Sequence, residues 1–246
     1  MRRHAVGLLL AAGLAACQTT ARETTSGDAQ PSQTALCEVH GPHDVSQAKI
    51  DACSAVLDRG GTKDEIAHAY ANRGMLYWAT RRVEEASADL DAAIAASPDR
   101  SELYLNRGAF RAQIGDYGHA EQDYQKALAL DPANSGAMNN LARVQIVRGD
   151  YAAGLAWIDR AIVIKSDLDV FHDTRAHALM GLGRIGAAAE AFDRAIAVGG
   201  PARAIRYQRQ LVVKGYDPGR FDGVMDDATW AALKNCIRDN CRLMLE

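Results

Sequence analysis

The side chains with the clearest potential for chemistry in this sequence are its five cysteines. Four of them form two local pairs, Cys37 with Cys53 and Cys236 with Cys241, and Cys17 stands alone near the N-terminus. Local cysteine pairs are typical of disulfide bonds in oxidising compartments. We therefore predict two disulfide bonds, of which the first would close a loop of about sixteen residues and contribute roughly 3 kcal/mol of stability.

A zinc site is the alternative for the first pair, because His40 and His43 lie between Cys37 and Cys53. Thiolates and imidazoles are the usual ligands of a structural Zn²⁺ ion. The spacing of these four residues does not match a familiar zinc-finger pattern, however, and an oxidising compartment favours the disulfide. The sequence therefore predicts no bound metal and no other cofactor.

No other group of residues has the spacing of a catalytic or metal site. Four aspartates within residues 217–227 lack the alternation of a calcium-binding EF-hand loop. His172 and His177 are five residues apart, which places them on different faces of a helix. The chain also lacks an HExxH motif, a serine elbow and a phosphate-binding glycine loop. We therefore expect this protein not to be an enzyme.

The N-terminus predicts the compartment in which the protein works. Arg2 and Arg3 precede an apolar run over residues 5–16, which is too short to span roughly 30 Å of hydrocarbon and is typical of a cleaved signal peptide. The run ends in Leu-Ala-Ala-Cys at residues 14–17, which resembles the lipobox of bacterial lipoproteins. The resemblance implies that residues 1–16 are removed and that Cys17 carries the lipid that anchors the protein.

The residues after Cys17 refine this prediction. Gln18 stands where an aspartate would resemble the inner-membrane retention signal, so the resemblance implies the periplasmic face of the outer membrane. Residues 17–36 are rich in Thr, Ser, Gln and Ala without apolar periodicity and predict a flexible tether. A plain secretory signal with an incidental cysteine is the alternative.

A period of 34 residues dominates the middle of the chain. Gly-Asp-Tyr at 115–117 recurs at 149–151, and Asn-Arg-Gly at 72–74 recurs at 106–108. This period, with its regular small residues, resembles the tetratricopeptide-repeat (TPR) family. The resemblance implies an all-α solenoid of about four helix-pair repeats over residues 65–200.

The turn inside each repeat has its own signal. Gly115, Gly149 and Gly183 follow the expected first helices, where a left-handed residue ends a helix without strain. Arg81 occupies this place in the first repeat. We therefore expect the first turn to be the most strained or to differ in shape.

Shorter segments flank the repeats. Ala48, Ala52 and Ala55 repeat the small-residue spacing of the second helices and predict a helix over residues 45–59. This helix, within a segment of residues 37–64, would cap the N-terminal end of the stack.

The C-terminal segment, residues 201–246, is a predicted helical hairpin. Its turn, from Gly215 to Val224, resembles that of a peptidoglycan-binding-domain-1 type module. The resemblance implies that Tyr216, Asp222 and Trp230 contact peptidoglycan. The usual Gly-Pro before Thr is absent, and Asn235-Cys236 replaces the closing Phe-Gln. A hairpin that only caps the solenoid is the alternative.

Composition agrees with a helical protein that binds other proteins. Only 6% of residues are aromatic and 48% are hydrophobic, with abundant alanine, which favours helix packing over a β-sandwich. A net charge of -3 does not provide the basic face that nucleic-acid binding requires.

In the TPR resemblance, the first helices line a concave face that binds partners. Its side chains here are mostly small or apolar, which favours an extended or helical peptide with apolar anchors. From this face we select as partner contacts Trp78, Asn139, Arg143, Asp173 and His177. The sequence thus predicts a non-enzymatic adaptor for envelope proteins, or alternatively a peptidoglycan-binding protein that acts through its C-terminal segment.

The first test concerns the anchor. We expect Cys17→Ser to abolish membrane association, because the sequence offers no other apolar anchor. Fractionation of cell envelopes measures this directly. Recovery of the variant in the outer-membrane fraction would contradict the lipobox prediction.

Overall fold

The computed structural model describes residues 32–38, 45–241 and 243. Several predictions fall outside the described residues: the signal peptide, the lipidated Cys17, most of the tether, and the histidines His40 and His43. The contacts divide the described chain into two compact units, one ending at Gly136 and the other beginning at Ala137. We refer to them as the N-terminal unit and the C-terminal unit.

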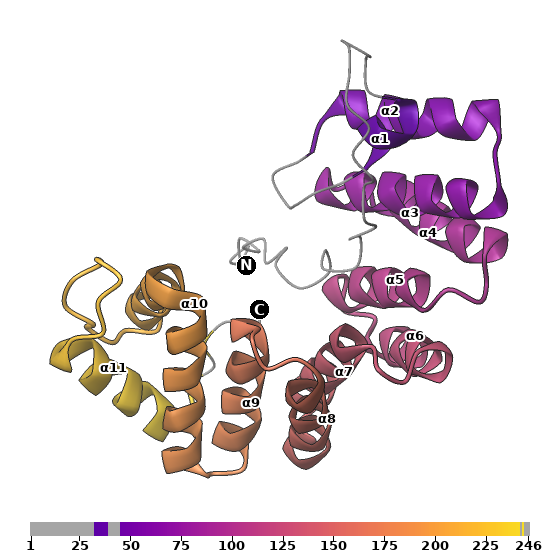
Figure 1. Ribbon diagram of the computed structural model, residues 1–246. Coiled ribbons are helices and arrows are strands. Elements are labelled where there is room, and N and C mark those ends of the chain that lie inside the picture. The colour runs from indigo at the N-terminus through magenta and orange to yellow at the C-terminus, as the bar shows by residue number, and fades with distance from the viewer. Residues whose placement is uncertain (1–31, 39–44, 242, 244–246) are drawn as a thin grey trace, which may run out of the picture. The chain divides into compact units, whose positions relative to one another are not determined.

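All regular secondary structure in the described residues is helical (Figure 1). The helices are α1 (Gln33–Cys37), α2 (Gln47–Arg59), α3 (Lys63–Ala79), α4 (Val83–Ala96), α5 (Ser101–Gln113), α6 (Tyr117–Leu130), α7 (Ser135–Val147), α8 (Tyr151–Ile164), α9 (Asp169–Gly181), α10 (Ile185–Val213) and α11 (Asp227–Arg238). Helices α5, α7 and α9 begin 34 residues apart, as do α6, α8 and α10. The predicted all-α fold of helix-pair repeats is confirmed.

Glycines set how closely the paired helices of the N-terminal unit approach. A Cβ atom on Gly108 of α5 would lie 2.7 Å from Tyr124 of α6, and one on Gly74 of α3 would lie 3.1 Å from Leu90 of α4. These large partners are themselves 1% exposed. The small residue in each first helix therefore makes room for the large residue of the second.

The Gly-Asp-Tyr motif ends one helix and starts the next. Gly115 and Gly149 have φ values of 86° and 87°, in the left-handed region. The side chains of Asp116 and Asp150 then accept hydrogen bonds from the backbone N–H groups of His119 and Ala153, at 3.3 and 3.0 Å. Each motif is thus a helix stop followed by an N-cap, which explains why it recurs at the same place in the repeat.

Arg81 adopts the glycine conformation although it has a side chain. Its φ is 65°, and the backbone N–H of Arg82 bonds to the carbonyl of Tyr77 at 2.8 Å. The corresponding bond in the second repeat, from Asp116 to Arg111, measures 2.9 Å. The first turn therefore has the same shape as the others and carries the strain of a non-glycine residue at positive φ.

Helix α2 packs against α3 at the start of the N-terminal unit. Ser46 caps it by accepting a hydrogen bond from the backbone N–H of Lys49 at 3.3 Å. The structure bonds Cys37 of α1 to Cys53 of α2, with a Cα–Cα distance of 4.7 Å. Both cysteines are buried, in a core shared with Leu76 of α3. The bridge therefore fastens the short helix α1 to the body of the unit.

Helix α10 of the C-terminal unit consists of two helices joined at Gly200, which has φ 60° and ψ -156° and precedes Pro201. The second part continues the repeat, because Tyr207 bonds to Asp173, 34 residues earlier. One core joins Met180, Phe192 and Tyr207 to Leu233 and Ile237 of α11. The C-terminal hairpin therefore packs on the fourth repeat as an additional helix pair. Its cysteines, Cys236 and Cys241, are bonded with a Cα–Cα distance of 5.0 Å.

The strained turn gives a stability test. We expect Arg81→Gly to stabilise the protein by about 0.5–1 kcal/mol, because glycine removes the cost of a side chain at positive φ. Gly115→Ala at the equivalent place is the matched control: nothing lies within 4 Å of its added Cβ, so only the backbone conformation is penalised. Thermal melting should shift upward for the first variant and downward for the second. Equal melting temperatures would contradict the assigned strain.

Candidate functional site

The predicted partner-binding side chains lie on the first helices, and in the N-terminal unit these are α3 and α5. We call their shared set of side chains the α3–α5 face. It comprises His68, Ala71, Met75 and Trp78 of α3 and Glu102, Leu105, Ala109 and Ala112 of α5. Five of these are partly exposed, and Ala71, Met75 and Leu105 are buried beneath them.

The apolar end of the α3–α5 face is organised around Trp78. Its ring meets that of Phe110 edge to face, with centroids 6.1 Å apart and planes at 83°. Phe110 is 2% exposed, whereas Trp78 stays partly exposed. Trp78 is therefore held by the core and still presents part of its ring to solvent. On either side of Phe110 in the α5 sequence, Ala109 and Ala112 have small, partly exposed side chains.

The other end of the face is charged. Arg100 forms ion pairs with Glu102 and, at 3.4 Å, with Asp64, while the imidazole of His68 lies 4.0 Å from Glu102. A hydrogen bond from Ser97, followed by Arg100, lowers the pKa of Asp64. Burial, followed by Arg100, lowers the pKa of His68, which is therefore neutral at pH 7. With two carboxylates against one guanidinium, this end has a residual negative charge.

Helix chemistry explains why these acids stand here. Asp64 lies in the first turn of α3 and Glu102 in the first turn of α5. Carboxylates in the first turn are stabilised by the positive end of the helix dipole. The local fold therefore places the acids side by side at the same end of two adjacent first helices, opposite Trp78.

In the C-terminal unit, three predicted partner contacts are buried. Asn139, Asp173 and His177 are 2%, 6% and 2% exposed. Thr174 donates to Asn139 at 2.8 Å and Tyr207 donates to Asp173 at 2.5 Å. These three side chains, predicted to contact a partner, are inaccessible in this structure: Asn139 and Asp173 accept hydrogen bonds from the next first helix, and His177 bonds within its own helix.

Further contacts hold the buried cluster around Asp173 together. The Nδ1 atom of His177 lies 2.8 Å from the backbone oxygen of Asp173, and its ring meets Phe192 edge to face at 5.3 Å. Arg203 bonds to Asp169 at 2.8 Å. Burial raises the pKa of Tyr207. The added helix pair thus covers the side of α9 that the sequence predicted to be accessible to a partner. Of the predicted contacts in the C-terminal unit, Arg143 is partly exposed and remains a candidate.

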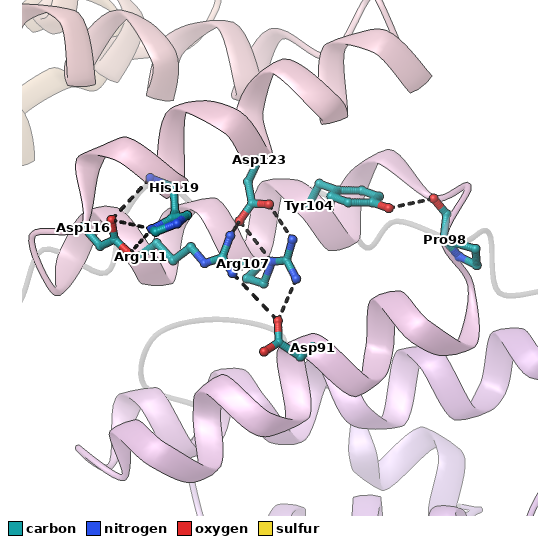
Figure 2. A network of polar contacts seen from close by, with 8 residues as sticks. All are labelled: Asp91, Pro98, Tyr104, Arg107, Arg111, Asp116, His119 and Asp123. Atoms are coloured by element: carbon teal, nitrogen blue, oxygen red, sulfur yellow. Dashed lines mark hydrogen bonds and ion pairs between the residues drawn. The ribbon is translucent and has the colours of Figure 1, made fainter.

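Other recurring charges hold the repeats together. Figure 2 shows Arg107 of α5 between two carboxylates, donating to Asp123 of α6 at 2.7 Å and to Asp91 of α4 at 2.6 Å. Arg111 adds a bond to Asp123 at 2.8 Å. The same relation joins Arg73 to Asp89 at 2.7 Å. Sequence reasoning did not select these residues, although the spacing of the arginines by 34 residues was the available signal.

The three predicted peptidoglycan contacts each have a partner within the chain. Tyr216 donates to Asp239 at 2.7 Å, which raises the pKa of Tyr216. Asp222 accepts from the backbone N–H of Val224 at 2.9 Å. Trp230 is partly buried and packs against the core of the unit. These contacts stabilise the hairpin and its turn.

Buried side chains hold the backbone of the loop between α10 and α11. The buried Gln208 accepts from the backbone N–H of Gly223 at 3.0 Å and donates to the carbonyl of Val224 at 2.9 Å. The buried Thr229 donates to the carbonyl of Pro218 at 2.8 Å. The loop therefore holds one conformation while leaving Phe221 53% exposed.

The described residues contain neither a cluster of metal-ligating side chains nor a helix suited to span a membrane. Within the described residues, no group of three or more His, Cys, Asp or Glu side chains is arranged to hold a metal ion. None of the described helices combines the length and apolar character of a membrane span.

Family models and relatives agree with the geometry. Two models, each described as tetratricopeptide repeat, match residues 71–135 with 174–209, and residues 111–182. The Hsp70-Hsp90 organizing protein of Triticum aestivum is 36% identical over 73 residues, which is 30% of this chain and 13% of that protein. Protein FlbA of Caulobacter vibrioides is 31% identical over 115 residues, 46% of this chain and 19% of that protein. The similarity thus spans less than a fifth of either relative.

Among solved structures, a crystal structure of MamA superposes with a TM-score of 0.52 at 20% sequence identity. The superposition covers 62% of this chain and 87% of that chain. At this identity the likeness concerns the fold alone.

The burial of Asp173 leads to a test of its structural role. We expect Tyr207→Phe to destabilise the protein by about 1–3 kcal/mol, because the buried carboxylate of Asp173 loses its hydroxyl donor. Tyr216→Phe is the matched control, since it removes a hydroxyl whose bond to Asp239 lies at the surface. Chemical denaturation of both variants measures the difference. Equal stabilities would mean that the Asp173 contact does not hold the added helix pair.

Proposed function

We propose, from the membership of residues 71–209 in the tetratricopeptide-repeat family, that this protein is a non-enzymatic scaffold that binds other proteins. Two relatives carry names that refer to chaperones: the Hsp70-Hsp90 organizing protein and Heat shock protein STI1 of Saccharomyces cerevisiae, the latter 33% identical over 75 residues. Their similarity to this chain covers 13% of each protein, so it supports the scaffold function without naming a partner.

The observation that carries the proposal is the contrast between the two units. The α3–α5 face keeps Trp78 and Ala112 partly exposed, whereas Ile146 and Met180, at the same place of the third and fourth repeats, are 1% and 3% exposed. A partner segment therefore binds on the N-terminal unit. A partly exposed tryptophan that is already ordered by Phe110 offers contact area at small entropic cost.

The charges of the face define the segment it accepts. The apolar end around Trp78 suits an apolar side chain, and the carboxylates of Asp64 and Glu102 suit a lysine or arginine. Residues 64 and 78 are separated by about 21 Å along a helix. An extended segment of roughly six or seven residues spans this length. The bound segment is thus a peptide with an apolar group at one end and a cation at the other.

The proposal also includes the cellular compartment in which the protein works. The lipobox at residues 14–17 supports a lipid anchor on Cys17 and a place on the periplasmic face of the outer membrane. The disulfide of Cys37 and Cys53 fits this compartment. The predicted tether precedes α1 in the chain, and the disulfide fastens α1 to the N-terminal unit. A pull on the protein from its lipid anchor would therefore be resisted by a covalent bond. Envelope proteins are then the available partners.

A second candidate function is peptidoglycan binding by the C-terminal hairpin. It is favoured by the loop between α10 and α11, whose backbone is fixed by Gln208 and Thr229 while Phe221 stays exposed. A fixed loop presents its side chains without loss of ordering entropy. Cosedimentation with purified sacculi tests this candidate, with Phe221→Ala as the variant. Truncation after Gly200 is unsuitable, because it removes Tyr207 and Leu233 from the shared core.

The test of the proposed function uses the protein without its lipid and a displayed library of random peptides. We expect selected peptides to combine an apolar and a basic residue and to lose about tenfold or more in affinity for Trp78→Ala. Trp78→Phe is the matched control and should retain most of the binding, because it keeps an aromatic ring over Phe110. Thermal melting separates lost binding from lost folding. Peptides that bind Trp78→Ala as tightly as the parent would overturn the proposal.

A further inference from the structure

Helix α8 differs from the second helices of the other repeats in a way that packing does not explain. Val163 stands where the other repeats have Ala95, Ala129 and Ala197. It is 88% exposed, and its neighbour Ile164 is 48% exposed. Side chains so exposed contribute little to the core. The exchange of alanine for a larger apolar residue is therefore unrelated to the stability of the repeat.

Trp157 is the second departure. Its place is held in the first two repeats by Asp89 and Asp123, each of which pairs with an arginine of its own first helix. In the third repeat Leu141 replaces that arginine and is 1% exposed. Because the third repeat has no arginine at this place, an aspartate at position 157 would have no such partner, which explains why the aspartate is absent there. A tryptophan that stays partly exposed does not follow from it, and the fourth repeat, which keeps the arginine as Arg175, has the smaller Ala191 at this place.

These residues lie together on one side of α8. Residues three and seven apart share a helix face, so Trp157, Arg160 and Ile164 are neighbours, and Val163 lies one turn from Arg160. The guanidinium of Arg160 lies over the ring of Trp157, 4.4 Å from its centroid. We call Trp157, Arg160, Val163 and Ile164 the α8 face. Its tryptophan and arginine order each other before any partner arrives.

The α8 face carries positive charge. Arg160 and Lys165 are exposed, and the nearby carboxylate of Asp159 is engaged by Arg175 at 2.7 Å. Asp167 is the other acid within residues 157–168. A second copy docked by a two-fold axis through this face would place Arg160 against its own equivalent, which is unfavourable. The charge complements a carboxylate on a different molecule.

From these observations we infer that the α8 face is a second binding surface, which takes a protein segment combining apolar side chains with a carboxylate. Trp and Arg are the residue types most enriched where binding energy concentrates. An exposed apolar cluster bordered by polar groups marks a contact site. A protein segment fits better than a lipid surface, because the face spans only about two helical turns, roughly 10 Å. The scaffold then holds two partner segments of opposite charge, a basic one on the α3–α5 face and an acidic one here.

The test uses the full chain without its lipid and with Trp78→Ala, so that failure of the α3–α5 face does not affect the result. A displayed library of random peptides is selected on this protein, and a synthetic peptide of the enriched sequence is the probe. We expect apolar residues next to Asp or Glu, and a loss of about tenfold or more in affinity on Val163→Glu and on Arg160→Glu. Both side chains are exposed, so melting temperatures should be unchanged.

Val213→Glu is the matched control, because Val213 is 76% exposed at the end of a different helix. Its affinity for the peptide should equal that of the parent. The inference is overturned if the enriched peptides lack acids, or if Val163→Glu binds them as tightly as Val213→Glu does. It is likewise overturned if Val163→Glu abolishes cosedimentation with phosphatidylglycerol vesicles, or self-association in sedimentation velocity, while peptide binding is absent.

Discussion

The close approach of the two helices within each repeat is the constraint on which the rest of the structure depends. Gly108 of α5 lies so near Tyr124 of α6 that a Cβ would meet the ring at 2.7 Å. The large residue reaches the core only because the small one leaves room. This fit fixes which side of each first helix turns toward its partner, and therefore which side is left to form the α3–α5 face.

Once the helix pairs are fixed, the polar residues of the repeats divide into two groups. Arg107, Asp123 and Asp91 connect three helices, with Asp123 buried, so their charges contribute to cohesion. Asp64 and Glu102 stand at helix starts on the exposed side, where the dipole stabilises them and Arg100 neutralises them only in part. The same chemical groups thus have different uses, depending on which side of the helix pair they occupy.

The added helix pair after Gly200 accounts for the difference between the two units. Tyr207 and Phe192 cover the side of α9 that carries Asp173 and His177, with Tyr207 bonded to Asp173 and Phe192 packed against the ring of His177. An open end of a repeat stack would expose apolar surface, and this pair covers it. The surfaces that we propose for binding are therefore the α3–α5 face, where Trp78 remains partly exposed, and the α8 face.

The sequence by itself determined the period, the helix pairs and the turns, because these depend on contacts between residues close in the chain: the glycine stop at Gly115, the cap at Asp116, and the small residues spaced for packing. It also identified the cysteine pairs, which are local. It did not determine which polar side chains remain accessible, and three of the five residues selected as partner contacts are buried. Only the tertiary structure decided this, since the burial of Asp173 depends on Tyr207, 34 residues away in a helix that the sequence assigned to a separate hairpin. Accessibility is a property of what packs on a side chain from elsewhere in the chain, and no local pattern encodes it.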